Sequence, residues 1–287
     1  MEWLAGAVKW KEMTFKVKFW GVRGSIPCSS PSYVVYGGNT SCVEVIADEQ
    51  HIILDAGTGL RALGHEMLGR TGRSSSILLS HTHWDHISGF PFFVPFFQSD
   101  YSFQIYSGHS HGYGGIRRVL STQMSSPLFP VPLSVLEAQL EFIDFHPGQD
   151  LQFGDRVVVK TASLNHPDGA TGYRVEFEGF SVCYVTDTEH VPGQMNDVIL
   201  DLISGADLVI YDSTYTDDEF SSRVGWGHST WQEGVRLCQA AKVKRYALFH
   251  HDPERDDDAM VRIEKEAASA WSSTVAARDG MEIIFSE

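Results

Sequence analysis

Four potential metal ligands lie within the stretch HTHWDH, directly after the short apolar segment SSILLS. They are His81, His83, Asp85 and His86. Imidazole nitrogens and carboxylate oxygens are common ligands of divalent ions, so the stretch predicts a metal site. A single regular helix would not aim all four inward, but a loop at a strand end can. His81 and His83 would bind one ion and Asp85 and His86 a second. One four-ligand zinc site is the simpler alternative, although adjacent ligands strain a tetrahedron.

Three further stretches place potential ligands after predicted strands. His166 lies in ASLNHPDG, Asp187 in CYVTDTEH, and His250 and His251 in YALFHHDP. Open α/β sheets gather the residues beyond their strand ends at one edge, so these side chains can join the first cluster. A carboxylate can bridge two ions while imidazoles complete each shell. The sequence therefore predicts a two-metal site.

The elements that must position these residues follow an α/β order. Runs such as FKVKFW, SSILLS and RYALFHH predict strands, and LRALGHEMLGR and TWQEGVRLCQAA predict helices. We find no repeat and no linker, so we predict a single domain over residues 16–287 after an N-terminal extension over residues 1–15. Residues 90–135 form an aromatic-rich insertion broken by prolines. We expect it to pack on the body of the domain or on a dimer partner, or to form a lid over a substrate pocket.

The stretch HTHWDH matches the H-x-H-x-D-H signature of the metallo-β-lactamase superfamily, and the chain resembles that family from about residue 16 to its last helix. The resemblance implies an αββα sandwich, with two mixed sheets flanked by helices. It also implies a dinuclear site with these ligands: His81, His83 and His166 on one ion, Asp85, His86 and His250 on the other, and Asp187 between them. His250 is preferred to His251 because it directly follows the apolar strand. Asp55, in ILDAGTG, would orient the metal-binding loop, or else simply end a strand.

Two further features resemble the phosphodiesterase branch of that family, which includes ribonuclease Z and cyclic-phosphate phosphodiesterases. They are Asp212 in ADLVIYDSTY and His228 in GWGHSTWQE. By this resemblance His228 would face the scissile phosphate, held by Asp212, and protonate the leaving oxygen. Ribonuclease Z usually has Glu at the position of Asp212. Asp85 would both bind metal and orient the attacking hydroxide.

Three other residues are weaker candidates. Arg23, in FWGVRGSIP, would pair with a phosphate oxygen or brace its loop. His109 and His111 lie in the glycine-rich stretch SGHSHGYGG and either reach the pocket or are simply solvated.

We therefore predict a hydrolase that cleaves a small or cyclic phosphodiester through a hydroxide activated by two divalent ions. Zinc is the first expectation for these ions, with manganese or iron as alternatives. A carbonyl hydrolase acting on a lactone, thioester or β-lactam is the second hypothesis, and a non-catalytic metal-binding module is the third. Full ribonuclease Z activity is less expected, because residues 90–135 are aromatic with few basic side chains.

Composition narrows the expected partners. The net charge is −15, and no block of five or more basic residues occurs, which argues against strong nucleic-acid binding. We expect a small phosphodiester as the substrate. We also consider a homodimer, because a second subunit would bury aromatic side chains of residues 90–135. The four cysteines are scattered, as in reduced cytoplasmic proteins. No apolar run approaches the length of a membrane span, so we expect no membrane partner and a cytoplasmic location.

Overall fold

The computed structural model describes residues 14–286, which form two seven-stranded sheets. The first sheet has the order β14-β1-β2-β3-β4-β5-β6. Its strands are β1 (Phe15–Gly21), β2 (Cys42–Ala47), β3 (Gln50–Leu54), β4 (Ser74–Leu79), β5 (Ser102–Ser107), β6 (Gln139–Asp144) and β14 (Glu282–Phe285). Neighbours from β3 to β6 are parallel, whereas β14, β1, β2 and β3 pair antiparallel, so the sheet is mixed as predicted.

The second sheet has the order β13-β12-β11-β10-β9-β8-β7. Its strands are β7 (Leu151–Phe153), β8 (Val157–Leu164), β9 (Ala170–Phe177), β10 (Phe180–Val185), β11 (Leu208–Asp212), β12 (Tyr246–Phe249) and β13 (Thr274–Ala276). Strands β10 to β13 are parallel, and β9 runs antiparallel to both β8 and β10. Strands β8, β10, β11 and β12 therefore point the same way and end at one edge.

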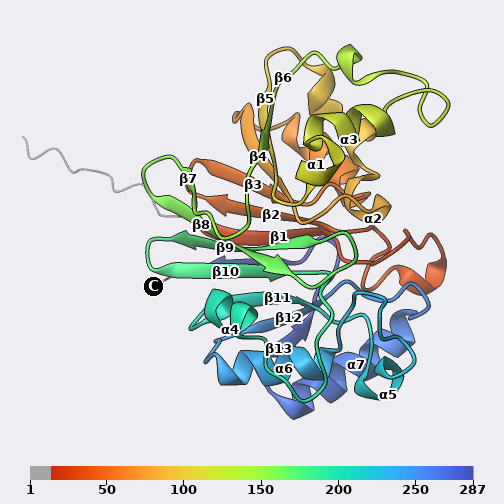
Figure 1. Ribbon diagram of the computed structural model, residues 1–287, viewed down its shortest axis with the longest axis vertical. Helices are drawn as coiled ribbons and strands as arrows, with labels where there is room; N and C mark the ends of the chain where they lie inside the picture. The colour runs from red at the N-terminus through yellow and green to blue at the C-terminus, as the bar shows by residue number, and fades with distance from the viewer. Residues whose placement is uncertain (1–13, 287) are drawn as a thin grey trace, which may run out of the picture.

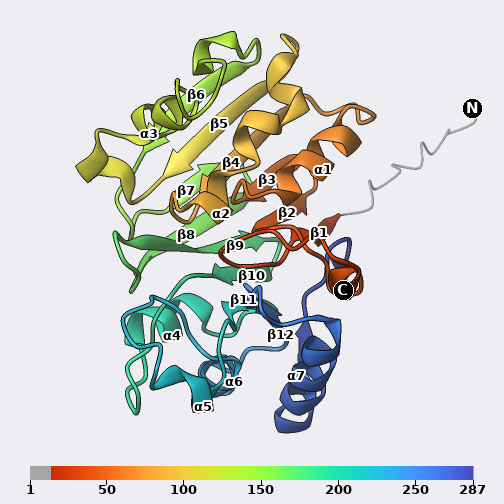
Figure 2. The same cartoon turned by 90° about the vertical axis from the view of Figure 1, so that its right-hand side faces the viewer.

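The two sheets face each other, and helices cover both outer sides (Figures 1 and 2). The helices are α1 (Gly59–Met67), α2 (Trp84–Ile87), α3 (Ile116–Gln123), α4 (Asp197–Ile203), α5 (Asp217–Phe220), α6 (Trp231–Ala240) and α7 (Asp257–Ala270). Short 3₁₀ turns occupy Pro31–Tyr33, Phe90–Phe92, Val94–Phe97, Ser110–Tyr113 and Leu133–Val135. Side chains such as Phe19, Tyr184 and Phe249 pack between the sheets, and separate clusters lie under the helices. The predicted αββα sandwich is confirmed.

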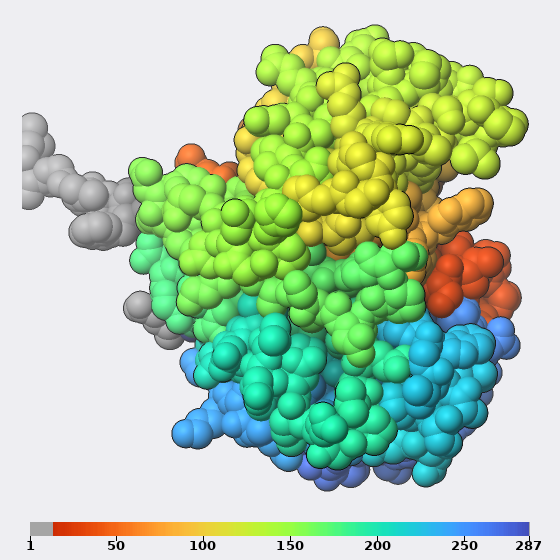
Figure 3. Space-filling view, in the orientation of Figure 1, coloured from red at the N-terminus to blue at the C-terminus, as the bar shows by residue number. Residues whose placement is uncertain are grey.

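Residues 90–135 are partly built into the first sheet. Strand β5 falls inside this range and pairs with β4 and β6, and α3 packs beside them. Phe96 is fully buried, and its ring lies 5.0 Å from that of Phe103, measured between centroids. The segment makes the upper end of the molecule (Figure 3). It thus packs on the body of the domain, and β5 is a strand that the sequence did not reveal, because SFQIYS carries polar residues at both ends.

Most of the N-terminal extension expected over residues 1–15 lies outside the described residues, although β1 already begins at Phe15. Within residues 14–286, none of the helices is long and apolar enough to cross a membrane.

Candidate metal centre

The stretch HTHWDH turns sharply at the end of β4. His81 follows the strand, His83 precedes α2, and Asp85 and His86 lie within that single-turn helix. The turn is tied to the body of the domain by a backbone hydrogen bond of 2.8 Å from Ala56 N to His86 O. The stretch therefore forms a loop that turns potential ligand atoms in two directions.

A first cluster joins His81 and His83 to His166, which lies just beyond β8. One ring nitrogen from each residue lies within 4.8 Å of the others. His166 Nε2 is 3.1 Å from His83 Nδ1, and His166 Nδ1 lies 2.7 Å from the carbonyl oxygen of Gly227. A proton on Nδ1 bonded to this carbonyl leaves the lone pair of Nε2 facing the other two histidines.

A second cluster contains Asp85, His86, Asp187 and His250, with ligand atoms again within 4.8 Å of one another. His250 Nε2 lies 3.1 Å from Asp85 Oδ2, and His86 Nε2 lies 3.2 Å from Asp187 Oδ1. All four side chains are buried. His250 follows β12 directly, and Asp187 lies two residues beyond β10, so the ends of the two parallel strands on either side of β11 supply them.

Asp187 lies between the two clusters. Its Oδ2 is 3.6 Å from His81 Nε2 and 3.7 Å from His166 Nε2. Its Oδ1 faces the other way, 3.3 Å from His250 Nε2. One carboxylate thus presents an oxygen to each group of imidazoles, which is the arrangement needed to bridge two ions.

The donor atoms fit bound metal ions. His81 Nε2 and His86 Nε2 are buried and make no well-oriented hydrogen bond among the described residues, although carboxylate oxygens of Asp187 and Asp85 lie 3.2 and 3.3 Å from His86 Nε2. A buried imidazole nitrogen without a partner is costly, whereas a metal ion would satisfy it. Burial lowers the pKa of His81 well below its usual range, which favours the neutral, ligating form. Burial alone would raise the pKa of Asp187, but His250 and His86 beside it keep it well below its usual range.

Asp55 fixes the HTHWDH loop through several hydrogen bonds. This buried carboxylate lies 2.7 Å from His86 Nδ1 and accepts hydrogen bonds of 2.7 Å from the hydroxyls of Ser80 and Tyr184. Its other oxygen accepts from Ser80 N at 2.7 Å. Because Nδ1 of His86 donates to Asp55, Nε2 carries the lone pair and faces the second cluster. These contacts fit the predicted orienting role.

The two adjacent histidines after β12 point in different directions. His250 Nε2 faces Asp85 and Asp187, and its Nδ1 lies 3.0 Å from Thr214 Oγ1. His251 instead places Nε2 2.9 Å from the carbonyl oxygen of Ala277, and burial lowers its pKa to about 3. The geometry therefore favours His250 over His251 as a ligand.

His228 and Asp212 lie beside the second cluster. His228 Nδ1 is 3.0 Å from Asp212 Oδ2 and 3.8 Å from Asp187 Oδ2. Burial alone would lower the pKa of His228, but the carboxylate of Asp212 raises it to about 9. Asp212 also accepts hydrogen bonds from Thr188 N and from the hydroxyl of Thr214. Asp212 and His228 also form a third group of potential ligands with Asp187 and His250, whose ligand atoms lie within 4.8 Å of one another. The hydrogen bonds that Asp212 accepts show that it also orients its neighbours.

Glu189 organises the loop that carries His228. Its Oε2 accepts backbone hydrogen bonds from Gly225 N at 2.7 Å and Gly227 N at 2.9 Å. Gly227 in turn presents its carbonyl to His166. One carboxylate therefore supports both a candidate ligand and a candidate acid. The sequence analysis missed this residue, and the only signal for it was its position two residues after Asp187.

The weaker candidates have structural contacts. The fully buried Arg23 donates to the backbone carbonyls of Gly37 at 2.8 Å and Arg255 at 2.6 Å. These contacts fit the bracing alternative rather than a contact with substrate. His109 lies 3.0 Å from Thr82 Oγ1 and borders a cavity beside the first cluster. His111 Nε2 lies 2.8 Å from the Phe145 carbonyl oxygen, and His111 belongs neither to the clusters nor to the lining of this cavity.

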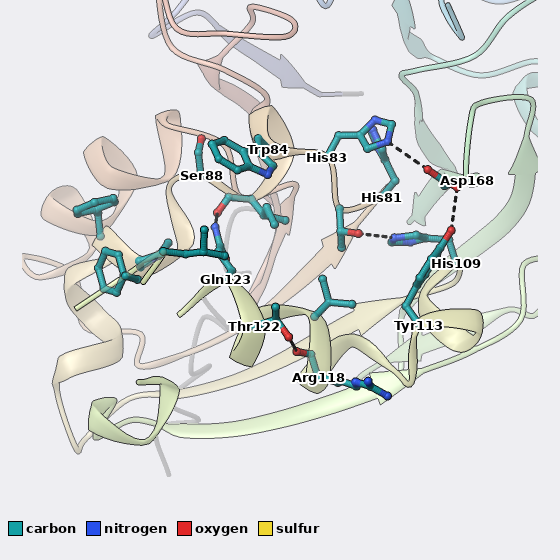
Figure 4. Close-up of a pocket in the computed structure, with 18 residues that line it drawn as sticks. His81, His83, Trp84, Ser88, His109, Tyr113, Arg118, Thr122, Gln123 and Asp168 are labelled. Carbon is teal, nitrogen blue, oxygen red and sulfur yellow. Dashed lines mark hydrogen bonds and ion pairs between the residues drawn. The ribbon is translucent and has the colours of Figure 1, made fainter. Parts of the chain in front are cut away.

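The cavity beside the first cluster has a volume of about 630 Å³ (Figure 4). His81 and His83 form part of its wall, and the rest comes largely from residues 84–129. Asp168 closes one side: its carboxylate accepts a 2.9 Å hydrogen bond from Tyr113 and lies 3.9 Å from His83 Nε2. Residues 90–135 thus shape a pocket as well as packing on the domain. Tyr113 and Asp168 had no recognisable signal in the sequence.

The chain belongs to the beta-lactamase superfamily, because the superfamily domain matches residues 50–251. The chain is 25% identical to a ribonuclease Z from Porphyromonas gingivalis over 308 residues, covering 89% of this chain and 96% of the relative. With this family and this His/Asp cluster, the prediction of a metal-dependent hydrolase is confirmed.

Solved structures show the same fold at low sequence identity. The Bacillus subtilis metallo-beta-lactamase fold protein YhfI has a TM-score of 0.71 at 19% identity, covering 96% of this chain and 100% of that one. The short form of human tRNase Z gives 0.66 at 22%, with 93% and 98% coverage. A diphosphatase from the PhnP family gives 0.67 at 17%, with 95% and 98% coverage. The predicted metallo-β-lactamase fold is therefore confirmed.

One prediction is wrong. The sequence led us to expect no strong nucleic-acid binding, yet relatives matched over most of the chain are ribonucleases. The expectation rested on the net charge of −15 and on the scarcity of basic side chains. Net charge averages over the whole surface, whereas bound cations would be the largest local charges at the site. A negative chain can therefore still offer a phosphate a positive site.

Proposed function

We propose that this chain hydrolyses phosphodiesters at the centre formed by the two clusters. The observation that carries this is the His228–Asp212 pair, with His228 Nδ1 only 3.8 Å from the carboxylate between the clusters. Departure of an alkoxide from phosphorus benefits from a positioned acid. Attack on a strained or activated carbonyl needs no such pair, so its presence favours phosphodiester chemistry.

Two divalent ions, when bound, would lower the pKa of a water molecule and neutralise charge on the phosphate oxygens. Their proposed ligands fall into two sets: His81, His83 and His166 in one, Asp85, His86 and His250 in the other, with Asp187 shared. Zinc is proposed first because the sites are rich in imidazole, and manganese or iron suit the same donors.

The protein's own residues have separate tasks. Asp85 lies in the second cluster, and its Oδ2 accepts a 2.7 Å hydrogen bond from Ser25 N, which fixes the carboxylate so that it can orient the attacking water. Asp212 holds His228 through Nδ1, which leaves Nε2 to give a proton to the departing oxygen. Binding of the substrate before reaction then depends on the residues that hold the metal ions, whereas His228 acts on the leaving group.

The names of the relatives support phosphodiesters as the substrate class and include RNA within it. The test is hydrolysis of bis(p-nitrophenyl) phosphate and of a 3′-extended tRNA by metal-reconstituted protein and His228→Ala. We expect two ions per chain in both proteins and, in the variant, a loss of about 10²- to 10⁴-fold in kcat on the tRNA, whose leaving group is an alkoxide. The loss on bis(p-nitrophenyl) phosphate should be smaller, because p-nitrophenolate departs without protonation. The exposed His111 provides a matched control, because His111→Ala should keep full activity. Turnover of a β-lactam, lactone or thioester, with no phosphodiester cleaved, would reject the proposal.

A further inference from the structure

The 630 Å³ cavity is continuous with the first metal cluster. His81 and His83 belong both to the cluster and to the cavity wall, and Figure 4 shows them together on one side of the hollow. The volume falls in the range of ordinary small-ligand pockets, about 300–1,000 Å³. A phosphate bound between the clusters would therefore have one of its organic groups at the mouth of this cavity.

The wall of the cavity is apolar and partly aromatic. Trp84, Phe92 and Leu128 line it although they are 79%, 55% and 63% exposed. Phe129 lines it too, and its ring meets that of Phe92 edge to face at 5.6 Å. Large apolar side chains left in water beside a reaction centre favour an apolar ligand, and aromatic rings offer faces on which a flat group can stack.

The position of His228 indicates which organic group enters. His228 does not line the cavity, whereas His83 does. The leaving oxygen must approach His228 to receive its proton. The other ester group, which stays on phosphorus, is then the one directed toward His83 and the cavity.

We propose that this cavity binds an aromatic ring carried by the ester group that remains on phosphorus after hydrolysis. The inference depends on the proposed phosphodiesterase function and adds a substrate class to it. The ring can belong to a simple aryl ester or to a nucleoside, because both present a flat face. A second copy of the chain is a poorer occupant, since the cavity is concave and shares two residues with the metal cluster.

The test compares substrates that share one leaving group. Bis(p-nitrophenyl) phosphate, methyl p-nitrophenyl phosphate and thymidine 5′-(p-nitrophenyl) phosphate all release p-nitrophenolate but retain an aryl, a methyl or a nucleoside group. We measure kcat/KM for each with wild type, Phe92→Ala and Leu128→Ala. Ile284→Ala is the matched control, since Ile284 is 66% exposed on β14 and does not line the cavity. The ratio of each variant to wild type cancels the different intrinsic reactivities of the esters.

We expect Phe92→Ala and Leu128→Ala to lower kcat/KM about tenfold for a ring-bearing substrate and to leave the methyl ester nearly unchanged. A larger loss of kcat/KM on the aryl ester would identify a simple aryl group as the ring, and a larger loss on the thymidine ester would identify a nucleoside. Calorimetric titration of metal-loaded protein with phenylphosphonate and methylphosphonate gives a second readout. Phenylphosphonate should bind more tightly to wild type, and the variants should lose that advantage.

Two failures are distinguishable. If wild type cleaves the esters but Phe92→Ala and Leu128→Ala lose kcat/KM equally on all of them, or on none, the cavity inference is overturned. The proposed phosphodiesterase function would then stand. A dimer of wild type that dissociates in both variants, without a change in substrate preference, would also overturn it and assign this surface to a second copy. Failure of wild type to cleave the three esters while it cleaves the 3′-extended tRNA would overturn the cavity inference only. Failure on all four substrates would reject both proposals.

Discussion

Nδ1 of His228 lies 3.0 Å from Oδ2 of Asp212, and the two side chains are 12% and 0% exposed. The carboxylate fixes the orientation of the ring and favours its charged form. The other ring nitrogen, Nε2, is left for the substrate. This relationship is the basis of the first prediction.

Replacing Asp212 with Asn should change the pH dependence of kcat. A general acid is active while protonated, so kcat falls as pH rises through the pKa of His228. Burial alone would lower this pKa from 6.5, but the carboxylate of Asp212 raises it to about 9. Removing the charge of Asp212 should therefore lower the pKa of His228. Bound cations would also lower this pKa, but they would do so in both wild type and variant. The alkaline limb of the kcat profile should therefore move to lower pH in Asp212→Asn. An unmoved limb would show that His228 is not the group that titrates.

Replacing Asp55 with Asn should weaken metal binding. Its carboxylate is 2.7 Å from His86 Nδ1 and fixes the ring so that Nε2 faces the second cluster. Loss of such a partner typically costs about 10- to 100-fold in metal affinity. Zinc affinity, measured by competition with a chromophoric chelator, should fall by this factor. Asp150→Asn, at an exposed position outside the site, is the matched control and should bind as wild type does.

His250 and His251 form a natural pair for counting ions. His250 faces Asp85 and Asp187, whereas His251 bonds to the Ala277 carbonyl. His250→Asn should lose close to one ion per chain by elemental analysis, while His251→Asn should retain the wild-type count even if its melting temperature falls. Loss of metal from His251→Asn alone would reverse the assignment of the ligand.

Glu189 should affect catalysis without binding metal or substrate. Glu189→Ala frees the two backbone amides of Gly225 and Gly227 and loosens the loop that carries His228. We expect kcat to fall about tenfold with little change in metal content, since a small misplacement of a catalytic group is costly. Glu189→Gln keeps an oxygen acceptor and should restore most of the rate. Equal losses in both variants would argue for a role of the charge instead.

The HTHWDH cluster was predictable because its ligands are adjacent in the chain and follow an obvious strand. His166, Asp187 and His250 were predictable for a related reason, since each follows a strand that ends at the same edge of the second sheet. Local sequence patterns were thus enough to predict most residues of the candidate site. The αββα layering followed from the family resemblance of the same motif.

Other contacts could not be predicted, because they depend on where distant loops meet. Tyr184 reaches Asp55 across 129 positions, and Glu189 reaches Gly225 across 36. The orientation of the Arg23 side chain is set by its hydrogen bond to the backbone carbonyl of Arg255, a contact that sequence spacing does not reveal. The cavity wall depends on how β5 and α3 place residues 84–129. Only the folded chain defines such relationships.

Residues 90–135 supply much of the cavity wall but none of the proposed metal ligands, although His81 and His83 also border the cavity. These ligands lie at residues 81–86 and beyond residue 165, whereas the segment occupies residues 90–135. The proposed reaction and the proposed choice of substrate would therefore depend largely on different stretches of the chain. A transplant of residues 90–135 from a relative, provided β5 keeps its pairing with β4 and β6, would redirect the enzyme toward another ester while its catalytic centre stays unaltered.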